Sequence, residues 1–241
     1  MNIDDKLIVA LDVHSLDKAC DLVKVLNLKV KIFKIGLELF TACGREAIEM
    51  VHGFGAKVFL DLKFHDIPNT VANAVSEAVK MGVFMLNVHT LGGRDMLEAA
   101  VKAVNAESQK LNKQRPVLLG VTILTSIDRA ALNSLGIAKS VRKEVIALAK
   151  LAKSSSMNGV VASCGEIEVI KSICGKDFIV VVPGIRPEAS INDDQKRTAA
   201  PEEAIKKGAD FIVVGRPVTK SENPLKAAEN ILAEISNYTG G

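Results

Sequence analysis

The chain has 241 residues, of which 48% are hydrophobic, enough to bury one large core. Its 31 basic and 28 acidic residues are spread along the whole sequence, so the net charge of +3 forms no basic tail or patch of the kind that binds polyanions. Aromatic residues make up only 4%, with no Trp and one Tyr, which removes the stacking platforms that single-stranded nucleic acid requires. Nucleic acid is therefore not expected as a partner.

The beginning of the chain, MNIDDKLIVALDV, has no basic segment followed by an apolar stretch of signal-peptide length. No later run approaches the roughly 20 apolar residues of a membrane span. We therefore expect a cytoplasmic protein that makes no contact with a membrane.

Cysteine and histidine positions predict no metal site. The cysteines lie far apart without a Cys-x-x-Cys spacing, and the histidines form no paired-ligand spacing, so neither zinc nor a disulfide framework is indicated. Buried free thiols are expected instead. His65 is expected to pack beneath its loop and to hydrogen-bond locally, with a catalytic role as the alternative. The cysteines are Cys20, Cys43, Cys164 and Cys174.

Eight short apolar runs rich in Val, Ile and Phe alternate with longer stretches of helical periodicity, which is typical of repeated βα units around a parallel sheet. Eight strands favour a closed barrel, because closure removes exposed edges and such barrels typically take about 250 residues. We predict a single (β/α)8 TIM barrel domain over residues 1–241, with its active site at the C-terminal ends of the strands. The runs are LIVALDV from Leu7, KIFKIG from Lys31, KVFLDLK from Lys57, FMLNVH from Phe84, VLLGVTIL from Val117, GVVAS from Gly159, FIVVVPG from Phe178 and DFIVVG from Asp210.

Helices are predicted between these runs. Candidates are LDKACDLVKVL at 16–26, PNTVANAVSEAVKMG at 68–82 and PEEAIKKGA at 201–209, the last two with a glycine suited to a left-handed helix cap. The polar segment 183–198, PGIRPEASINDDQKRT, contains Pro and Gly and follows the seventh run. Its composition and position indicate a mobile lid.

Charged residues end the first three predicted strands, where a barrel of this kind places its active site. They are Asp12, Lys34, Asp61 and Lys63, with Asp66 just beyond. Side chains alternate along a strand, so Asp61 and Lys63 are expected on one face. If Lys34, Asp61, Lys63 and Asp66 meet, their charges alternate, which keeps the lysines protonated and the carboxylates ionised.

The alternative for these charges is a set of solvated loop salt bridges, each worth about 0–1 kcal/mol. Four such residues at the strand ends of one barrel favour the catalytic interpretation. The seventh and eighth runs end in a glycine with an arginine just beyond it, Gly184 with Arg186 and Gly215 with Arg216, at the place where barrels commonly bind phosphate. The alternative there is a tight turn beside a solvated arginine.

The segment VFLDLKFHDIPNTV at 58–71 contains the pattern Asp-x-Lys-x-x-Asp in a form that resembles the orotidine 5'-phosphate decarboxylase family. Further segments also resemble the family and occur along the chain in the same order as in the family, over residues 7–219. They are LIVALDV, FKIGLELF, VTILTS, PGIRP, DDQKR and IVVGRPVT. The resemblance implies decarboxylation of orotidine 5'-monophosphate to uridine 5'-monophosphate and CO2, the last step of de novo pyrimidine biosynthesis. It implies that this carboxy-lyase uses no metal and no cofactor.

The resemblance also implies residue roles. Asp12 and Lys34 would contact the ribose, Asp61 would lie beside the substrate carboxylate, and Lys63 would deliver the proton to C6 of the pyrimidine. Asp66 and Thr70 would come from the neighbouring subunit of a homodimer. The remaining implied substrate contacts are Ile67 lining the pocket, Thr125 with Ser126 at the pyrimidine edge, Arg186 in the substrate loop, and Gln195, Gly215 and Arg216 at the phosphate.

Two other functions compete with this one. Magnesium-dependent keto-gulonate phosphate decarboxylases and hexulose phosphate synthases share Asp-x-Lys-x-x-Asp, but they need a carboxylate at the end of the second strand, where Lys34 would repel the cation. A non-catalytic protein that binds a phosphate ligand could also keep the barrel, since fold does not imply function. Against it, such a binder has no use for alternating buried charges that cost desolvation energy.

Overall fold

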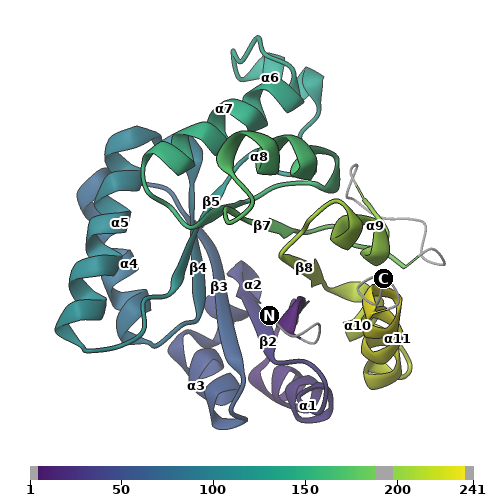
Figure 1. The fold of residues 1–241 in the computed structure, drawn as a ribbon. Coiled ribbons are helices and arrows are strands. Elements are labelled where there is room, and N and C mark those ends of the chain that lie inside the picture. The colour runs from purple at the N-terminus through teal and green to yellow at the C-terminus, as the bar shows by residue number, and fades with distance from the viewer. Residues whose placement is uncertain (1–4, 188–197, 237–241) are drawn as a thin grey trace.

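The computed structural model describes residues 5–187 and 198–236. Eight strands form a closed barrel in which each strand pairs in parallel with the next and β8 pairs with β1 (Figure 1). All eight predicted runs contain a strand, and the predicted (β/α)8 barrel is confirmed. The strands are β1 Leu7–Ala10, β2 Ile32–Gly36, β3 Lys57–Phe64, β4 Met85–His89, β5 Val117–Val121, β6 Gly159–Val161, β7 Ile179–Val182 and β8 Phe211–Val214.

Helices surround the barrel and connect its strands (Figure 1). The three predicted helices are confirmed as α1, α4 and α9, and the glycines expected to cap two of them, Gly82 and Gly208, have φ of 75° and 98°. The α-helices are α1 Leu16–Leu26, α2 Leu37–Cys43, α3 Arg45–Gly53, α4 Pro68–Lys80, α5 Gly93–Lys110, α6 Arg129–Ser134, α7 Val141–Ser154, α8 Ile167–Cys174, α9 Pro201–Lys206, α10 Arg216–Thr219 and α11 Pro224–Ser236. The 3-10 helices are η2 Thr90–Gly92 and η3 Cys164–Glu166.

The core has two layers because side chains alternate across each strand. One set fills the space between the sheet and the helices, as Val9, Phe33 and Leu60 do. The other fills the barrel interior, and its members Ala10, Phe59 and Val213 also line a cavity at the end of the barrel. The interior set is Ile8, Ala10, Ile32, Phe59, Met85, Leu119, Val181, Phe211 and Val213.

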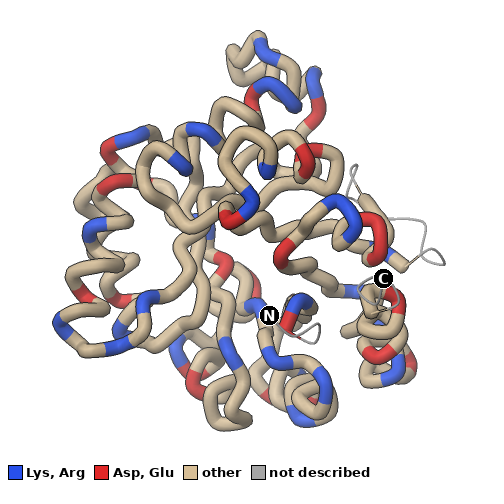
Figure 2. Tube along the Cα trace, in the orientation of Figure 1, with Lys and Arg blue, Asp and Glu red and all other residues tan. Residues whose placement is uncertain are grey.

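Acidic and basic residues are intermixed along the tube in Figure 2, as the sequence indicates. Over residues 5–187 and 198–236, no helix is both long enough and apolar enough to cross a membrane.

All four cysteines are free. Cys164 and Cys174 are buried as expected, whereas Cys20 and Cys43 are only partly buried, so the expectation of burial holds for two of the four.

Gly159 is a position where the backbone of the neighbouring strand leaves no room for a side chain. It opens β6 and pairs with Ile179 of β7. A Cβ atom added there would lie 2.1 Å from the backbone oxygen of Ile179 and 2.6 Å from its Cβ. Backbone atoms cannot move aside as a flexible side chain can, so a methyl group here must push two strands apart.

We predict that Gly159→Ala lowers the free energy of unfolding by about 3 kcal/mol through overpacking. Gly53→Ala is the matched control, because no atom lies within 4 Å of its added Cβ and it ends a helix. That control should leave stability unchanged or raise it by up to about 1 kcal/mol. Urea unfolding followed by circular dichroism measures both variants. Equal stability of the two would contradict the packing described for β6 and β7.

Candidate active site

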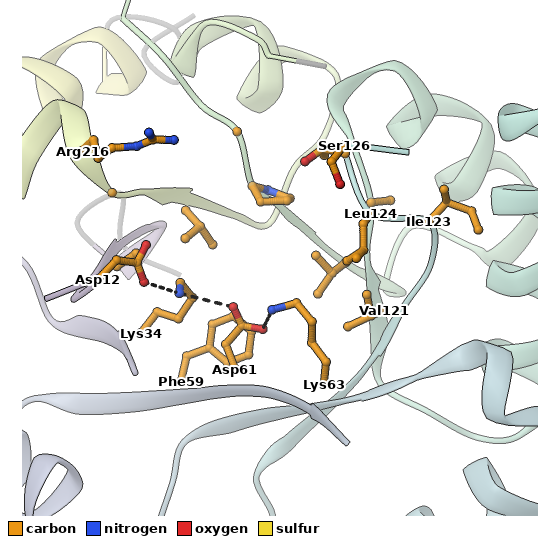
Figure 3. A pocket seen from close by; sticks show the side chains of 18 of the residues that line it. Asp12, Lys34, Phe59, Asp61, Lys63, Val121, Ile123, Leu124, Ser126 and Arg216 are labelled. Atoms are coloured by element: carbon orange, nitrogen blue, oxygen red, sulfur yellow. Dashed lines mark hydrogen bonds and ion pairs between the residues drawn. The ribbon is translucent and has the colours of Figure 1, made fainter. Parts of the chain in front are cut away.

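A cavity of about 350 Å³ opens at the C-terminal ends of the strands. Its lining includes the apolar side chains of Phe59, Val121, Val161 and Val213. Charged side chains from several strand ends line the same cavity (Figure 3). The closed barrel brings together residues that are about 200 positions apart in the sequence, as Asp12 and Arg216 are. The site therefore lies at the end of the barrel where the sequence predicts it.

Four charged side chains form a continuous row along one wall of the cavity (Figure 3). The Nζ of Lys34 lies 3.0 Å from Oδ1 of Asp12 and 3.3 Å from Oδ2 of Asp61. The Nζ of Lys63 donates to Oδ1 of Asp61 at 2.7 Å. Negative and positive groups thus alternate from Asp12 to Lys63, and this part of the predicted cluster is present within one chain.

Burial and neighbouring charge compete at the centre of this row. Burial favours the neutral form of Asp61, but Lys34 and Lys63, with hydrogen bonds from Lys63 and Asn87, outweigh it and hold the pKa of this carboxyl below its ordinary value. Burial likewise opposes the charge on Lys34, but Asp61 and Asp12 outweigh it and raise the pKa of this ammonium. Both groups are therefore charged at neutral pH.

Strand β3 is irregular where it carries Asp61 and Lys63. Its pairing with β4 shifts between Leu60 and Phe64, and Lys63 has a φ of 51°, in the left-handed region that costs a non-glycine residue about 1–2 kcal/mol. The two side chains meet as predicted. The alternation of side chains along a regular strand does not by itself explain why they meet, because the strand bulges at this point.

Asn87 of β4 completes this region and is not among the residues predicted from the sequence. Its side-chain Oδ1 accepts a hydrogen bond from the backbone N–H of Lys63 at 2.8 Å, and its Nδ2 donates to Oδ1 of Asp61 at 2.6 Å. Only 1% of Asn87 is exposed. The available signal was an amide inside the mostly apolar run FMLNVH, because a buried amide requires hydrogen-bond partners.

Glycines make room for the charged row. A Cβ added to Gly36, the last residue of β2, would lie 2.9 Å from Nζ of Lys34 and 3.3 Å from Oδ1 of Asp12. Gly215, which follows β8, lies across from the other carboxylate oxygen of Asp12, with its added Cβ at 3.4 Å. A larger residue at Gly36 would therefore displace the ion pair between Lys34 and Asp12.

The predicted phosphate-binding residues that the structure describes line the same cavity. Gly184, Arg186, Gly215 and Arg216 all contribute to its wall. The guanidinium group of Arg216 stands above Asp12, on the side of the cavity away from Lys63 (Figure 3). The cavity wall thus carries cationic side chains in two places. Arg186 and Arg216 lie near the ends of β7 and β8, and Lys34 and Lys63 lie within the charged row.

The loop after β5 supplies Thr125 and Ser126 to the cavity, where the resemblance places the pyrimidine contacts. Gln195 lies outside the described residues, as does most of the predicted lid at 183–198. The described start of that segment pairs with the residue that follows its end: the N–H of Arg186 donates to the backbone oxygen of Ala199 at 2.9 Å.

Three predicted site residues do not reach this cavity within the chain. Asp66, Ile67 and Thr70 belong to an exposed loop and helix start after β3, and none of them lines the cavity. Oδ1 of Asp66 accepts a hydrogen bond from the N–H of Ile67 at 2.6 Å. Of the four residues predicted to alternate in charge, Lys34, Asp61 and Lys63 meet and Asp66 stands apart.

His65, in the same loop, is exposed, so the expectation that it packs beneath the loop is wrong. Its ring stacks on that of His89 at the end of β4, with ring centroids 5.3 Å apart. Burial, with smaller effects from His65 and Lys63, lowers the pKa of His89 to about 4.

Within the part of the chain that the structure describes, no group of three or more His, Cys, Asp or Glu side chains is placed to hold a metal ion.

The closed barrel and the Asp-x-Lys-x-x-Asp segment at the end of β3 define a class of barrel proteins whose site lies at the mouth of the strands. Residues 5–231 match the model of the orotidine 5'-phosphate decarboxylase / HUMPS family. The chain belongs to this family, and the predicted resemblance is confirmed.

Relatives agree with this assignment. The orotidine 5'-phosphate decarboxylase of Moorella thermoacetica is 49% identical over 236 residues, which are 98% of this chain and 94% of the relative. That of Trichlorobacter lovleyi is 50% identical over 96% of this chain and 95% of its own. The crystal structure of the Lactobacillus acidophilus enzyme superposes with a TM-score of 0.85 at 37% identity, covering 96% of this chain and 99% of that one. The predicted enzyme class, a carboxy-lyase of this family, is thereby confirmed.

Proposed function

We propose that this protein converts orotidine 5'-monophosphate to uridine 5'-monophosphate and CO2, with Lys63 as the proton donor and without a metal or cofactor. Family membership and the names of its relatives support the decarboxylation and its place in pyrimidine biosynthesis. The observation that carries the role of Lys63 is its position at the end of the charged row, 2.7 Å from an ionised Asp61 and facing the cavity. We further propose that the whole chain acts as one domain in the cytoplasm.

The difficulty of the reaction lies in the electron pair that remains at C6. When the bond between C6 and the carboxylate breaks, this pair has no conjugated group into which it can spread. The ammonium group of Lys63 stabilises the developing negative charge and then transfers a proton to C6, leaving a neutral amine that regains its proton from solvent. This stabilisation arises mainly in the transition state, so it raises turnover.

The other charged groups have separate tasks in this proposal. Asp61 lies beside the substrate carboxylate, and its repulsion is relieved as CO2 leaves, a secondary contribution. Asp12 and Lys34 bind the ribose hydroxyl groups, and Thr125 binds the pyrimidine edge. Support for this arrangement comes from the single row that contains Asp12, Lys34 and Asp61.

The phosphate would bind at the opposite side of the cavity, where Arg186, Gly215 and Arg216 lie, together with Gln195. A guanidinium group suits this role, since it can donate two parallel hydrogen bonds to phosphate oxygens. Binding energy from this remote group can be used to hold the pyrimidine against Lys63.

The magnesium-dependent alternative fits the charged row poorly. A cation bound by Asp61 and a carboxylate at the end of β2 would have to occupy the place of the Lys34 ammonium, which lies within 3.3 Å of both Asp12 and Asp61. Lys34 therefore supplies the positive charge that a metal ion would bring.

We predict that the wild-type protein releases CO2 from orotidine 5'-monophosphate in the presence of EDTA and that Lys63→Ala lowers kcat by about 10³-fold or more. Loss of the orotate absorbance measures the rate. Lys80→Ala, which removes an exposed lysine at the end of α4, is the control and should retain wild-type activity. Activity that requires Mg2+ and a sugar phosphate would instead support the alternative.

We also propose that Asp66, Ile67 and Thr70 act in the site of a neighbouring subunit in a homodimer. Large apolar side chains are exposed after three consecutive strands at the same end of the barrel: Leu37 after β2, Ile67 after β3 and Leu91 after β4, with 57%, 67% and 41% exposed. A second copy that covers this face would bury them and would bring Asp66 towards a charged row.

We predict that a mixture of two inactive variants, Lys63→Ala and Asp66→Ala, regains about a quarter of wild-type activity after subunit exchange, because half of the dimers are mixed and each mixed dimer has one intact site. Each variant incubated alone is the control. No recovery in a mixture whose subunits have exchanged, as mass spectrometry can show, would place Asp66 in the site of its own chain.

A further inference from the structure

The bulge in β3 leaves one residue of β4 opposite three. Leu60 pairs with Leu86 and Phe64 pairs with Val88, so residues 61–63 lie opposite Asn87 alone. Such a bulge removes backbone groups from the regular ladder of hydrogen bonds between strands. Those groups need other partners, because an unpaired buried N–H costs about 1–3 kcal/mol.

Asn87 supplies these partners through both ends of its side-chain amide. Its oxygen accepts the backbone N–H of Lys63, and its nitrogen donates to the carboxylate of Asp61. The same oxygen of Asp61 also accepts from the ammonium of Lys63. The amide therefore links the backbone of Lys63 and the side chain of Asp61 to the same residue of β4.

Asn87 cannot act on a substrate directly. It is 1% exposed and is not among the residues that line the cavity. Its effect must therefore pass through Asp61 and Lys63. The left-handed backbone of Lys63, with a φ of 51°, persists only where its surroundings hold it, and the bond from its N–H to Asn87 is one such constraint.

We propose that Asn87 is a positioning residue for decarboxylation: it holds the β3 bulge so that the Lys63 ammonium and the Asp61 carboxylate stay in register with each other at the mouth of the barrel. This inference rests on the proposed function, since it assigns Asn87 a part in the same reaction. A displacement of about 1 Å in a reacting group can cost about 10²-fold in rate. Loss of the amide should therefore lower kcat.

The first test compares Asn87→Leu with the wild type, because leucine keeps the approximate size and loses both hydrogen bonds. We expect kcat to fall by about 10²-fold while KM changes by less than about 3-fold. Asn158→Leu is the matched control: Oδ1 of Asn158 accepts the backbone N–H of Leu118 at 3.0 Å, the same kind of bond at the other end of the barrel. This control should keep the wild-type kcat. A wild-type kcat in a folded Asn87→Leu variant would overturn the proposal.

The second test, Asn87→Asp, separates positioning from general stability and also serves if the leucine variant does not fold. When the introduced carboxyl group is protonated, it can accept from the Lys63 N–H and donate to Asp61, as the amide does. When it ionises, it repels Asp61. We expect kcat relative to wild type to fall by at least about 10-fold as pH rises through this ionisation. A ratio that is constant with pH would contradict a positioning role.

A third readout does not depend on catalysis. The backbone amide hydrogen of Lys63 should exchange with solvent at least about 10-fold faster in Asn87→Leu than in the wild type or Asn158→Leu, as measured by NMR. If the wild type fails to decarboxylate orotidine 5'-monophosphate, the proposed function fails, while faster exchange still supports the bond between Asn87 and Lys63. Unchanged exchange would show that Asn87 does not hold the bulge.

Discussion

The placement of the Asp61 carboxylate between two lysine ammonium groups is the constraint on which the rest of the site depends. A buried carboxylate by itself would be expelled or neutralised, because burial favours its uncharged form. Lys34 and Lys63 reverse this preference and keep Asp61 ionised. They can do so only while β2 and β3 hold their ends side by side, so the chemistry of the site depends directly on the register of the barrel.

The barrel provides that register through a core that is independent of the charges. Below the cavity, Phe59 and Val213 belong to an apolar interior that fixes the strands from within. The site above departs from regular structure: Lys63 has a left-handed backbone, and β3 bulges against β4. Strain of this kind gathers at functional sites and is stabilised by the packing around it.

The fold was predictable from the sequence because its signals are local and repeated. Eight apolar runs and the glycine after α4, Gly82, fix strands and a helix end through rules that operate within a few residues. The charged row was predictable as a group, since parallel strand ends meet at one edge. The bulge was not, because a regular strand would also place Asp61 and Lys63 on one face. Asn87 and the separation of Asp66 from the row depend on tertiary contacts that no periodicity indicates.

The charge of the Asp61 carboxylate between its two lysines can be measured directly by NMR. In protein labelled with 13C at aspartate side chains, the Cγ resonance of Asp61, assigned through Asp61→Asn, can be followed from about pH 7 to about pH 4.5. We predict that this resonance keeps the position of an ionised carboxylate throughout, because the pKa of Asp61 lies below the ordinary value of 3.8. We also predict that Lys34→Met raises the pKa of Asp61. A titration midpoint within that range in the wild type would show that Lys34 and Lys63 do not keep Asp61 ionised.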